Sequence, residues 1–227
     1  KTKFVQNVFS SVAPNYDVMN DLMSLGMHRL WKRRFVEIID IKNNDVILDV
    51  GSGSGDIAKE IIKKKFITEL YLLDLNKAML NQGKNRLGKE KNINFIIGNA
   101  EKLNFPDNLF DKYIISFCLR NVTNYLVSIK EAYRVLKPGG KYCCLEFSTP
   151  QSSLFSNAYK IYKSRILPLL GDIVANDKNA YKYLSESIDL FPTQDDLTKQ
   201  LINCGFQNVK SINLFNGIVA IHTGYKI

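Results

Sequence analysis

The chain has 227 residues, of which 45% are hydrophobic and 23% charged, and its formal net charge at pH 7 is +9. This length and balance indicate one large globular domain. No apolar run approaches the ~20 residues of a membrane-spanning helix, and the longest apolar stretch, at 166–175, is interrupted by Gly171 and Asp172.

The cysteines and histidines do not form a metal-ligating pattern. No C-x-x-C pair occurs, and His28 and His222 lie far apart, so we expect no metal site. Cys143 and Cys144 lie in an apolar run, where cysteine acts as a small hydrophobe. We therefore expect a reducing compartment.

The positive charge is a weaker signal. It is typical of proteins that bind nucleic acid or anionic lipid, but a lysine-rich solvated surface is the commoner cause. The densest basic cluster is HRLWKRRF at 28–35, which lacks a sustained basic and aromatic pattern. Charge alone therefore leaves the partner open.

The N-terminal half predicts helices followed by an alternating α/β core. Apolar residues at helical spacing predict a helix that ends at Pro14 and a second helix over 28–40. The predicted strands are 46–50, 69–75, 93–98, 112–118 and 141–147, with helices at 56–65, 77–87 and 128–136 and a turn at 137–140. Such apolar, β-branched strands are typical of a parallel sheet buried on both faces.

The pattern changes after residue 149. Residues 150–192 predict a helical insertion over the carboxyl edge of the sheet. A helix with Thr193 as its N-cap follows, and two strands around Asn216-Gly217 predict an antiparallel hairpin. We expect one domain made of a helical cap, a cofactor-binding core, the insertion and a C-terminal helix and hairpin, over 1–40, 41–149, 150–192 and 193–227.

The most specific local motif is DVILDVGSGSGD at 45–56, where three glycines alternate after Asp49. Such a loop holds a ligand against bare backbone. A dinucleotide would need a glycine at Asp56, whose carboxylate would face the pyrophosphate, and no G-K-[ST] follows to make a P-loop. A purely structural turn stays the alternative.

The next two strands predict contacts for a nucleoside. Asp74 ends the second strand, where its carboxylate can bind both ribose hydroxyls, although it could instead cap the next helix. The third strand runs into Gly98-Asn-Ala-Glu101, whose amide and backbone groups could read an adenine. Because no phosphate-binding element accompanies these features, we expect S-adenosyl-L-methionine as the ligand.

Several dispersed motifs resemble the ubiquinone/menaquinone biosynthesis C-methyltransferase family, within the class I methyltransferases. The similar segments, at 8–32, 115–124, 134–150, 181–192 and 217–226, span almost the whole chain. The resemblance implies a Rossmann-like α/β fold with a seven-stranded, mostly parallel sheet, an antiparallel C-terminal hairpin and helices on both faces. N-terminal helices and the helical insertion would form a lid.

The resemblance also implies the reaction. A methyl group would pass from S-adenosylmethionine to a ring carbon of a polyprenylated quinol, either demethylmenaquinol or a methoxy-polyprenyl-benzoquinol. The product would be S-adenosylhomocysteine, and no metal would take part. Position by position, the family's cofactor contacts would be Ser54, Asp74, Asn99, Ala100 and Ser116. Ser54 stands where the family usually has threonine, which keeps a hydroxyl.

Other residues complete the predicted site. The loop residues Asp49, Gly51 and Gly55 would also contact the cofactor, and Tyr16 with Asn20 would close over its methionine half or cap the N-terminal helices. Weaker candidates are Asp177, Tyr181 and His222, the last more often structural. For the two tyrosines that flank Lys182, packing of the insertion is the alternative role. An apolar groove for the tail would come from Phe155, Tyr159, Ile166, Leu167, Leu169 and Leu170, with core packing as their alternative role.

Arg120, in LRNVT, is the first candidate for activation of the acceptor. A guanidinium stays protonated, so it would stabilise a developing phenolate or orient a water that takes the proton. Its alternative role is an ion pair with a neighbouring carboxylate.

Two other interpretations have less support. The charge suggests an RNA methyltransferase, but the fourth strand leads into SFCLRN rather than an Asn/Asp-Pro-Pro-aromatic motif, so we expect no nucleic acid partner. The second interpretation is a non-catalytic scaffold that keeps the fold without the activity.

The lipid tail leads us to expect membrane-surface association near Arg29–Arg34, and a quinone-biosynthesis complex or a homodimer would fit. The location would be the bacterial cytoplasm at the inner membrane, or the mitochondrial matrix side.

Overall fold

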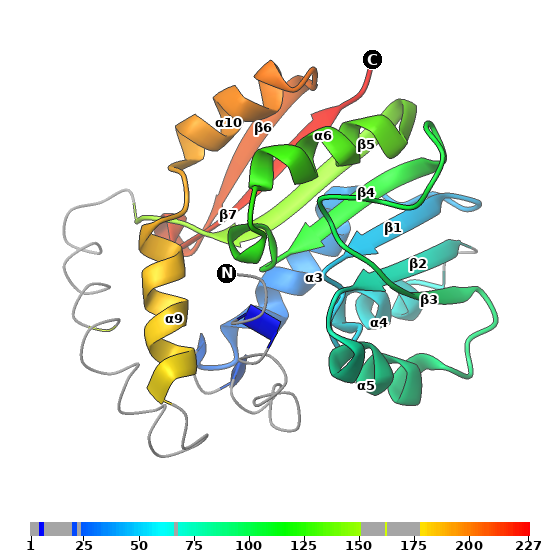
Figure 1. Cartoon of the computed structure of the whole chain (residues 1–227), viewed down its shortest axis with the longest axis horizontal. Helices are drawn as coiled ribbons and strands as arrows, with labels where there is room; N and C mark the ends of the chain where they lie inside the picture. Colours follow the sequence, from blue (N-terminus) through cyan, green and yellow to red (C-terminus); the bar gives the residue numbers. More distant parts are fainter. Residues whose placement is uncertain (1–4, 7–19, 22–23, 66–67, 151–161, 163–177) are drawn as a thin grey trace.

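The structure is a computed structural model that describes residues 5–6, 20–21, 24–65, 68–150, 162 and 178–227. Its seven-stranded sheet has the order β3-β2-β1-β4-β5-β7-β6 (Figure 1). The strands are β1 Val46–Val50, β2 Glu69–Asp74, β3 Ile93–Ile97, β4 Phe110–Ser116, β5 Leu136–Phe147, β6 Gln207–Leu214 and β7 Val219–Tyr225. Only β7 runs against its neighbours, so the predicted mostly parallel sheet with an antiparallel C-terminal hairpin is confirmed.

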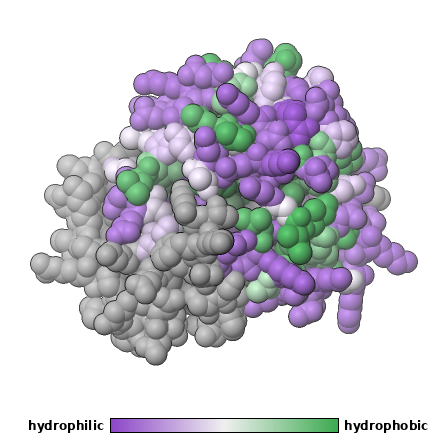
Figure 2. Space-filling view, viewed as in Figure 1, coloured by the Kyte–Doolittle hydropathy of each residue, from purple (hydrophilic) through white to green (hydrophobic). Residues whose placement is uncertain are grey.

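Helices cover both faces of this sheet, as predicted. The described helices are α3 Met27–Ile39, α4 Asp56–Lys63, α5 Lys77–Leu87, α6 Tyr125–Val135, α9 Lys178–Asp189 and α10 Gln194–Asn203, with short 3-10 turns η2 Leu119–Asn121 and η4 Phe215–Gly217. One buried core joins the sheet to α6 and α10, and the other joins it to α3 and α4. Hydrophilic side chains dominate the described part of the face over α6 and α10 (Figure 2).

The alternation of side chains along the strands explains the two cores. Cys143 packs in the core with α3 and α4, and Cys144 packs in the core with α6 and α10. Ile114 and Ile115 divide in the same way. Successive residues of a strand point to opposite faces, so a strand buried on both sides is apolar throughout. The two cysteines are buried small hydrophobes, as expected.

The predicted turn at 137–140 is wrong. These residues belong to β5, which begins at Leu136, and the pairing with β4 shifts register before Lys141. Gly139 adopts a φ of 81° and its N–H donates to the Lys226 carbonyl at 2.6 Å. Pro138 and the glycines therefore make an irregular strand start that pairs with the C-terminus.

The C-terminal elements follow the prediction. Thr193 Oγ1 accepts a hydrogen bond from the Asp196 N–H at 3.2 Å, so it is the N-cap of α10. Asn216, with a φ of 55°, lies in the turn between β6 and β7. Helix α9 confirms a helix in part of the expected insertion. Of the helix predicted to end at Pro14, the structure describes only residues 5–6, which are helical. Most of the insertion lies outside the described residues.

Candidate functional site

A cavity lies where the chain order of the strands reverses, at the carboxyl ends of β1 and β4. Such switch points are the usual ligand sites of open α/β sheets. The cavity measures about 810 Å³, its open mouth included. Its walls come from residues at the strand ends, together with Met79 and with Val5 and Gln6 of the N-terminal segment. The strand-end residues are 50–51, 53, 73–76, 98–101, 116–118 and 121–123.

The glycine loop forms the floor of this cavity. Gly51 has a φ of 66°, and a Cβ built on it would lie 2.2 Å from Cys118 Sγ. Gly53 has a φ of 55° and donates its N–H to Asp74 Oδ2 at 2.8 Å. No side chain fits at Gly51, so backbone is what the loop presents to a ligand.

Asp74 holds two loops at once. Its Oδ2 accepts from Gly53, and its Oδ1 accepts from the Asn76 N–H at 2.7 Å. The alternative role as helix cap belongs instead to Asn76, whose Oδ1 accepts from the N–H groups of Ala78 and Met79 at 2.9 and 3.2 Å. Burial raises the Asp74 pKa, and the backbone hydrogen bonds oppose that shift. Each carboxylate oxygen keeps a second lone pair for a ligand hydroxyl.

Unpaired polar atoms lie behind and beside the loop. Neither Asp49 oxygen has a hydrogen-bond partner among the described residues, although Asp49 is buried. Burial, with the charges of Asp74 and Asp56, raises the Asp49 pKa to about 8. The hydroxyls of Ser54 and Ser116 also lack partners within the described chain. This environment suits a ligand that brings an ammonium group and hydrogen-bond donors, as the methionine half of S-adenosylmethionine does.

The third wall follows β3. Asn99 Oδ1 accepts from the Glu101 N–H at 2.9 Å, and Ala100 is buried. Glu101 Oε1 accepts from the Thr123 N–H at 2.7 Å and so joins this wall to the loop after η2. The side chain of Glu101 was not among the predicted contacts. It could have been suspected, because it directly follows the Asn99–Ala100 pair.

Among the predicted residues, the structure brings Gly51, Asp74, Asn99, Ala100 and Ser116 together as cavity-lining residues. Asp49, Ser54, Gly55 and Arg120 are not among the residues that line the cavity. Tyr16, Asp177 and the expected tail groove lie outside the described residues, as does the side chain of Tyr181. Their proposed contacts therefore stay predictions.

Arg120 forms an ion pair with Glu146, which was its alternative role. Its Nη1 lies 2.6 Å from Glu146 Oε1 and donates to the Phe117 carbonyl at 2.7 Å. Burial raises the Glu146 pKa, and the positive charge of Arg120 opposes that shift. Any catalytic role for Arg120 stays a prediction, since the guanidinium does not line the cavity.

The prediction missed two residues beside Arg120. Asn121 lines the cavity, and its Nδ2 donates to the Phe117 carbonyl at 3.2 Å. The Tyr183 hydroxyl donates to Asn121 Oδ1 at 3.1 Å, so this tyrosine does more than pack the insertion. The position of Asn121 next to Arg120 at a strand end was the available signal. Tyr183 lies 62 residues away, and local sequence gave no signal for the pairing.

His222 has a structural position. It is buried on β7, away from the cavity lining, and its Nε2 lies 3.1 Å from the Gln194 carbonyl. Burial lowers its pKa. The interpretation of His222 as a structural residue is therefore the one that the contacts favour.

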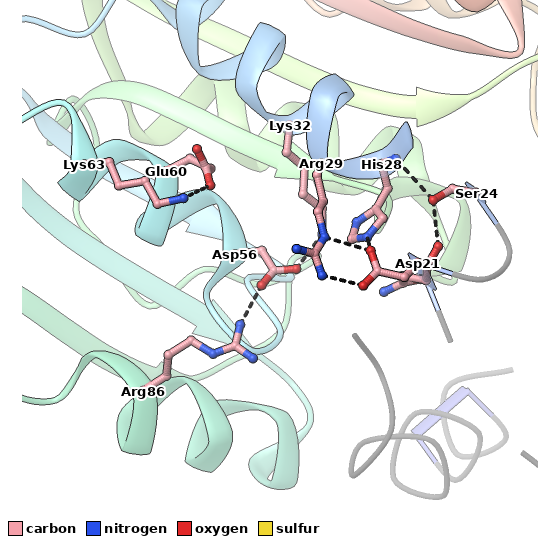
Figure 3. Close-up of polar contacts among 10 residues, drawn as sticks. Asp21, Ser24, His28, Arg29, Lys32, Asp56, Glu60, Lys63 and Arg86 are labelled. Atoms are coloured by element: carbon pink, nitrogen blue, oxygen red, sulfur yellow. Dashed lines mark hydrogen bonds and ion pairs between the residues drawn. The ribbon is translucent and has the colours of Figure 1, made fainter. Parts of the chain in front are cut away.

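Asp56 does not face the cavity. The expectation that its carboxylate would face the pyrophosphate of a dinucleotide is therefore wrong. Its Oδ2 lies 2.5 Å from Lys32 Nζ and its Oδ1 lies 2.7 Å from Arg86 Nη1 (Figure 3). The positive charge of Lys32 is the main cause that lowers the Asp56 pKa against the effect of burial. Asp56 therefore joins α3, α4 and α5 at the end of the glycine loop.

The basic cluster of α3 lies around this junction. Arg29 pairs with Asp21, Arg33 reaches Glu60 at 3.8 Å, and Arg34 pairs with Glu37 at 2.9 Å. Within the described ranges, no group of three or more His, Cys, Asp and Glu side chains is placed to hold a metal ion. No helix in the described part of the chain is long and apolar enough to cross a membrane.

Solved structures share this fold. The chain matches a chain of the complex between the Haloferax volcanii Trm112 methyltransferase activator and a methyltransferase, with a TM-score of 0.73 and 15% identity over 98% of this chain and 97% of that one. It also matches the Haemonchus contortus phosphoethanolamine N-methyltransferase 2 in complex with S-adenosyl-L-methionine, with a TM-score of 0.65 and 17% identity over 86% of this chain and 52% of that one. The sheet order and these matches show the fold of the class I methyltransferases.

The family follows from the sequence. The model of the ubiE/COQ5 methyltransferase family matches residues 1–226. A Rickettsia bellii protein named ubiquinone/menaquinone biosynthesis C-methyltransferase UbiE is 49% identical over 234 residues, which cover 100% of this chain and 94% of the relative. The chain belongs to the ubiE/COQ5 methyltransferase family.

Proposed function

We propose that this enzyme transfers a methyl group from S-adenosylmethionine to a ring carbon of a polyprenylated quinol, in ubiquinone or menaquinone biosynthesis. The family and the name of the relative support the acceptor class. The observation that carries the cofactor assignment is Asp74, which holds the glycine loop and lines the same cavity. An activity assay determines which head group the enzyme methylates, a benzoquinol or a demethylmenaquinol.

The residues proposed for the site would bind different parts of S-adenosylmethionine. Asp74 would accept from the ribose hydroxyls, and Asn99 with Ala100 would contact the adenine. Ser116 and the buried Asp49 would serve the methionine half, with Asp49 opposite its ammonium group. Gly51, Ser54 and Gly55 would shape the loop, and Tyr16 would close over the site. When bound, S-adenosylmethionine supplies an electrophilic methyl group on a sulfonium.

The acceptor side must activate a weak nucleophile. Loss of a ring hydroxyl proton spreads negative charge to the ortho carbon, which then attacks the methyl group. Arg120 would stabilise the phenolate through its fixed positive charge, held in place by Glu146. Because a guanidinium does not readily release its own proton, water is the proposed acceptor of the hydroxyl proton. As the new carbon–carbon bond forms, the bond between methyl and sulfur breaks and S-adenosylhomocysteine is the leaving group. The ring carbon then passes its own proton through water to the ring oxygen, which restores the aromatic quinol.

The first test is calorimetry with S-adenosylmethionine on the wild type and on Asp74→Ala. We expect micromolar binding, weakened roughly 10- to 100-fold in the variant, since a hydrogen bond to a charged group contributes about 1.5–3 kcal/mol. Asp107→Ala, at an exposed carboxylate on Arg134, is the matched control and should bind normally. If the folded wild type does not bind, the scaffold interpretation takes its place.

The second test compares acceptors. Benzoquinol and demethylmenaquinol analogues with prenyl tails are offered with labelled S-adenosylmethionine, and transfer to ring carbon is followed. We expect transfer to at least one head group and none to RNA. Binding of the cofactor without transfer to either quinol would refute the acceptor class.

We also propose that α3 contacts an anionic membrane surface. Leu25 and Leu30 are 82% and 52% exposed and flank the exposed side chain of Arg29. Apolar and basic side chains side by side are typical of interfacial helices. The protein would work in a bacterial cytoplasm at the inner membrane or on the mitochondrial matrix side, as a homodimer or in a complex of quinone-biosynthesis enzymes.

Vesicle flotation tests the membrane proposal. Vesicles with anionic lipid should carry the wild type at low salt, release it at high salt and carry less of a Leu25→Ser/Leu30→Ser variant. Neutral vesicles are the control. No association with anionic vesicles at low salt would refute the proposal.

A further inference from the structure

A hydrogen bond joins helix α9 to the cavity wall. The helix lies beyond the carboxyl ends of β4 and β5 (Figure 1). The Tyr183 hydroxyl of this helix donates to Asn121 Oδ1 at 3.1 Å, and Asn121 lines the cavity. The hydrogen bond therefore connects the helical insertion to the cavity wall beside Arg120.

Two contacts fix the orientation of the Asn121 amide. Its Nδ2 donates to the Phe117 carbonyl, and its Oδ1 accepts from Tyr183. Both contacts are satisfied by the same orientation of the amide, with Oδ1 toward the hydroxyl donor and Nδ2 toward the carbonyl acceptor. If the amide were flipped, its oxygen would lie against the Phe117 carbonyl oxygen. Among the described residues, the second N–H of the amide group has no acceptor, so it is available to a ligand in the cavity.

The rest of α9 is anchored independently of this bond. Ser187 and Ile188 are buried, and the Phe191 ring packs edge-on against Tyr125 with ring centroids 6.1 Å apart. These contacts hold the C-terminal end of α9. Loss of the Tyr183 hydroxyl would therefore release the Asn121 amide without detaching the helix.

We propose that Tyr183 is a positioning residue for methyl transfer: its hydroxyl orients Asn121 so that the free amide N–H donates to the ring oxygen of the quinol. A fixed donor at this oxygen stabilises the phenolate as it forms, because a preorganised dipole needs no reorganisation during the reaction. Arg120 adds positive charge from the adjacent position of η2. The inference rests on the proposed function and adds a residue from the insertion to the site.

The variant that tests it is Tyr183→Phe, which removes only the hydroxyl. We expect unchanged affinity for S-adenosylmethionine and a fall of about 5- to 10-fold in kcat/KM for the quinol, the size of one hydrogen bond. The fall should be largest at low pH and shrink as the quinol ionises in solution. Tyr133→Phe, which removes the hydroxyl of a tyrosine that packs on Phe206, is the control and should match the wild type.

A double-variant cycle separates positioning from packing. If Tyr183 acts through Asn121, then Tyr183→Phe adds nothing to the loss caused by Asn121→Ala. Losses that multiply, a loss equal at every pH, or wild-type activity in Tyr183→Phe would each overturn the proposal.

Hydrogen exchange keeps the test independent of the acceptor. Without any substrate, Tyr183→Phe should speed amide exchange in η2, which carries Asn121, and leave exchange in α4 unchanged. If quinols are not methylated by the wild type but exchange changes as expected, the acceptor class fails and the contact stands. Unchanged exchange in η2 refutes the contact whatever the acceptor.

Discussion

Arg120 and Glu146 form an ion pair whose side chains are only 6% and 2% exposed, with Nη1 2.6 Å from Oε1. Glu146 lies near the end of β5, and Arg120 lies in η2 after β4. Glu146 Oε2 also accepts from the Arg120 N–H at 3.3 Å. The carboxylate therefore holds both the backbone and the side chain of the turn that forms the proposed acceptor wall.

Glu146→Gln should lower the free energy of unfolding by about 3–5 kcal/mol, since it leaves a buried guanidinium without its counter-charge. The Arg120→Met/Glu146→Leu double variant should lose less than this single variant, because no charge stays buried. Urea denaturation measures both. A Glu146→Gln variant within experimental error of the wild type would contradict the prediction.

The Asp49 pKa of about 8 predicts a pH-dependent stability. Because the folded-state pKa is raised, the stabilisation is present at acid pH and is lost as the pH rises toward 8. The free energy of unfolding of the wild type should therefore fall relative to Asp49→Asn, by at most about 1.4 kcal/mol per pH unit between pH 4 and 8. Thermal denaturation of both proteins across this window checks it, and parallel curves would contradict it.

Gly51→Ala should abolish binding of S-adenosylmethionine, because the new Cβ would meet Cys118 Sγ at 2.2 Å. Gly26→Ala is the matched control: its φ is also positive, at 75°, but nothing lies within 4 Å of the added atom. The control should lose about 1–2 kcal/mol of stability from backbone strain and keep its affinity. Adding Cys118→Gly to Gly51→Ala should recover part of the stability, and no recovery would refute the clash.

Asp56→Ala should lower the free energy of unfolding by about 2–3 kcal/mol, because Lys32 loses its partner. The loss is smaller than for a fully buried pair, since the Asp56 side chain is 20% exposed. Glu37→Ala removes an exposed pair with Arg34 and should cost less than ~1 kcal/mol. Urea denaturation compares the two variants. Equal losses would show that the junction of α3, α4 and α5 is not held by Asp56.

The sequence predicted what depends on neighbouring residues. Apolar runs located the strands, and Thr193 and Asn216 located a cap and a turn. The Lys137–Gly140 segment was misjudged because proline and glycine favour turns locally, whereas pairing with Lys226 decides its structure. Tertiary pairing outweighed local preference there.

The candidate site shows the same division. Gly51 and Asp74 follow from the order of the motifs, and they line one cavity. The partners Glu146 and Tyr183 lie 26 and 62 residues from the groups that they contact. No spacing rule predicts such pairs, since they depend on which strands are neighbours and where α9 packs. The orientation of Asp56 was missed for the same reason.

The strand order also bears on how this enzyme diversifies. Apart from Tyr16 and Ser116, the groups proposed for the cofactor come from one continuous stretch, residues 49–100, which ends just after β3. Tyr183 instead reaches the cavity wall from a segment that enters after β5. Replacement of that segment leaves the register of the five parallel strands intact. The choice of acceptor can thus evolve by replacement of this one segment, while the residues that bind the methyl donor stay unchanged.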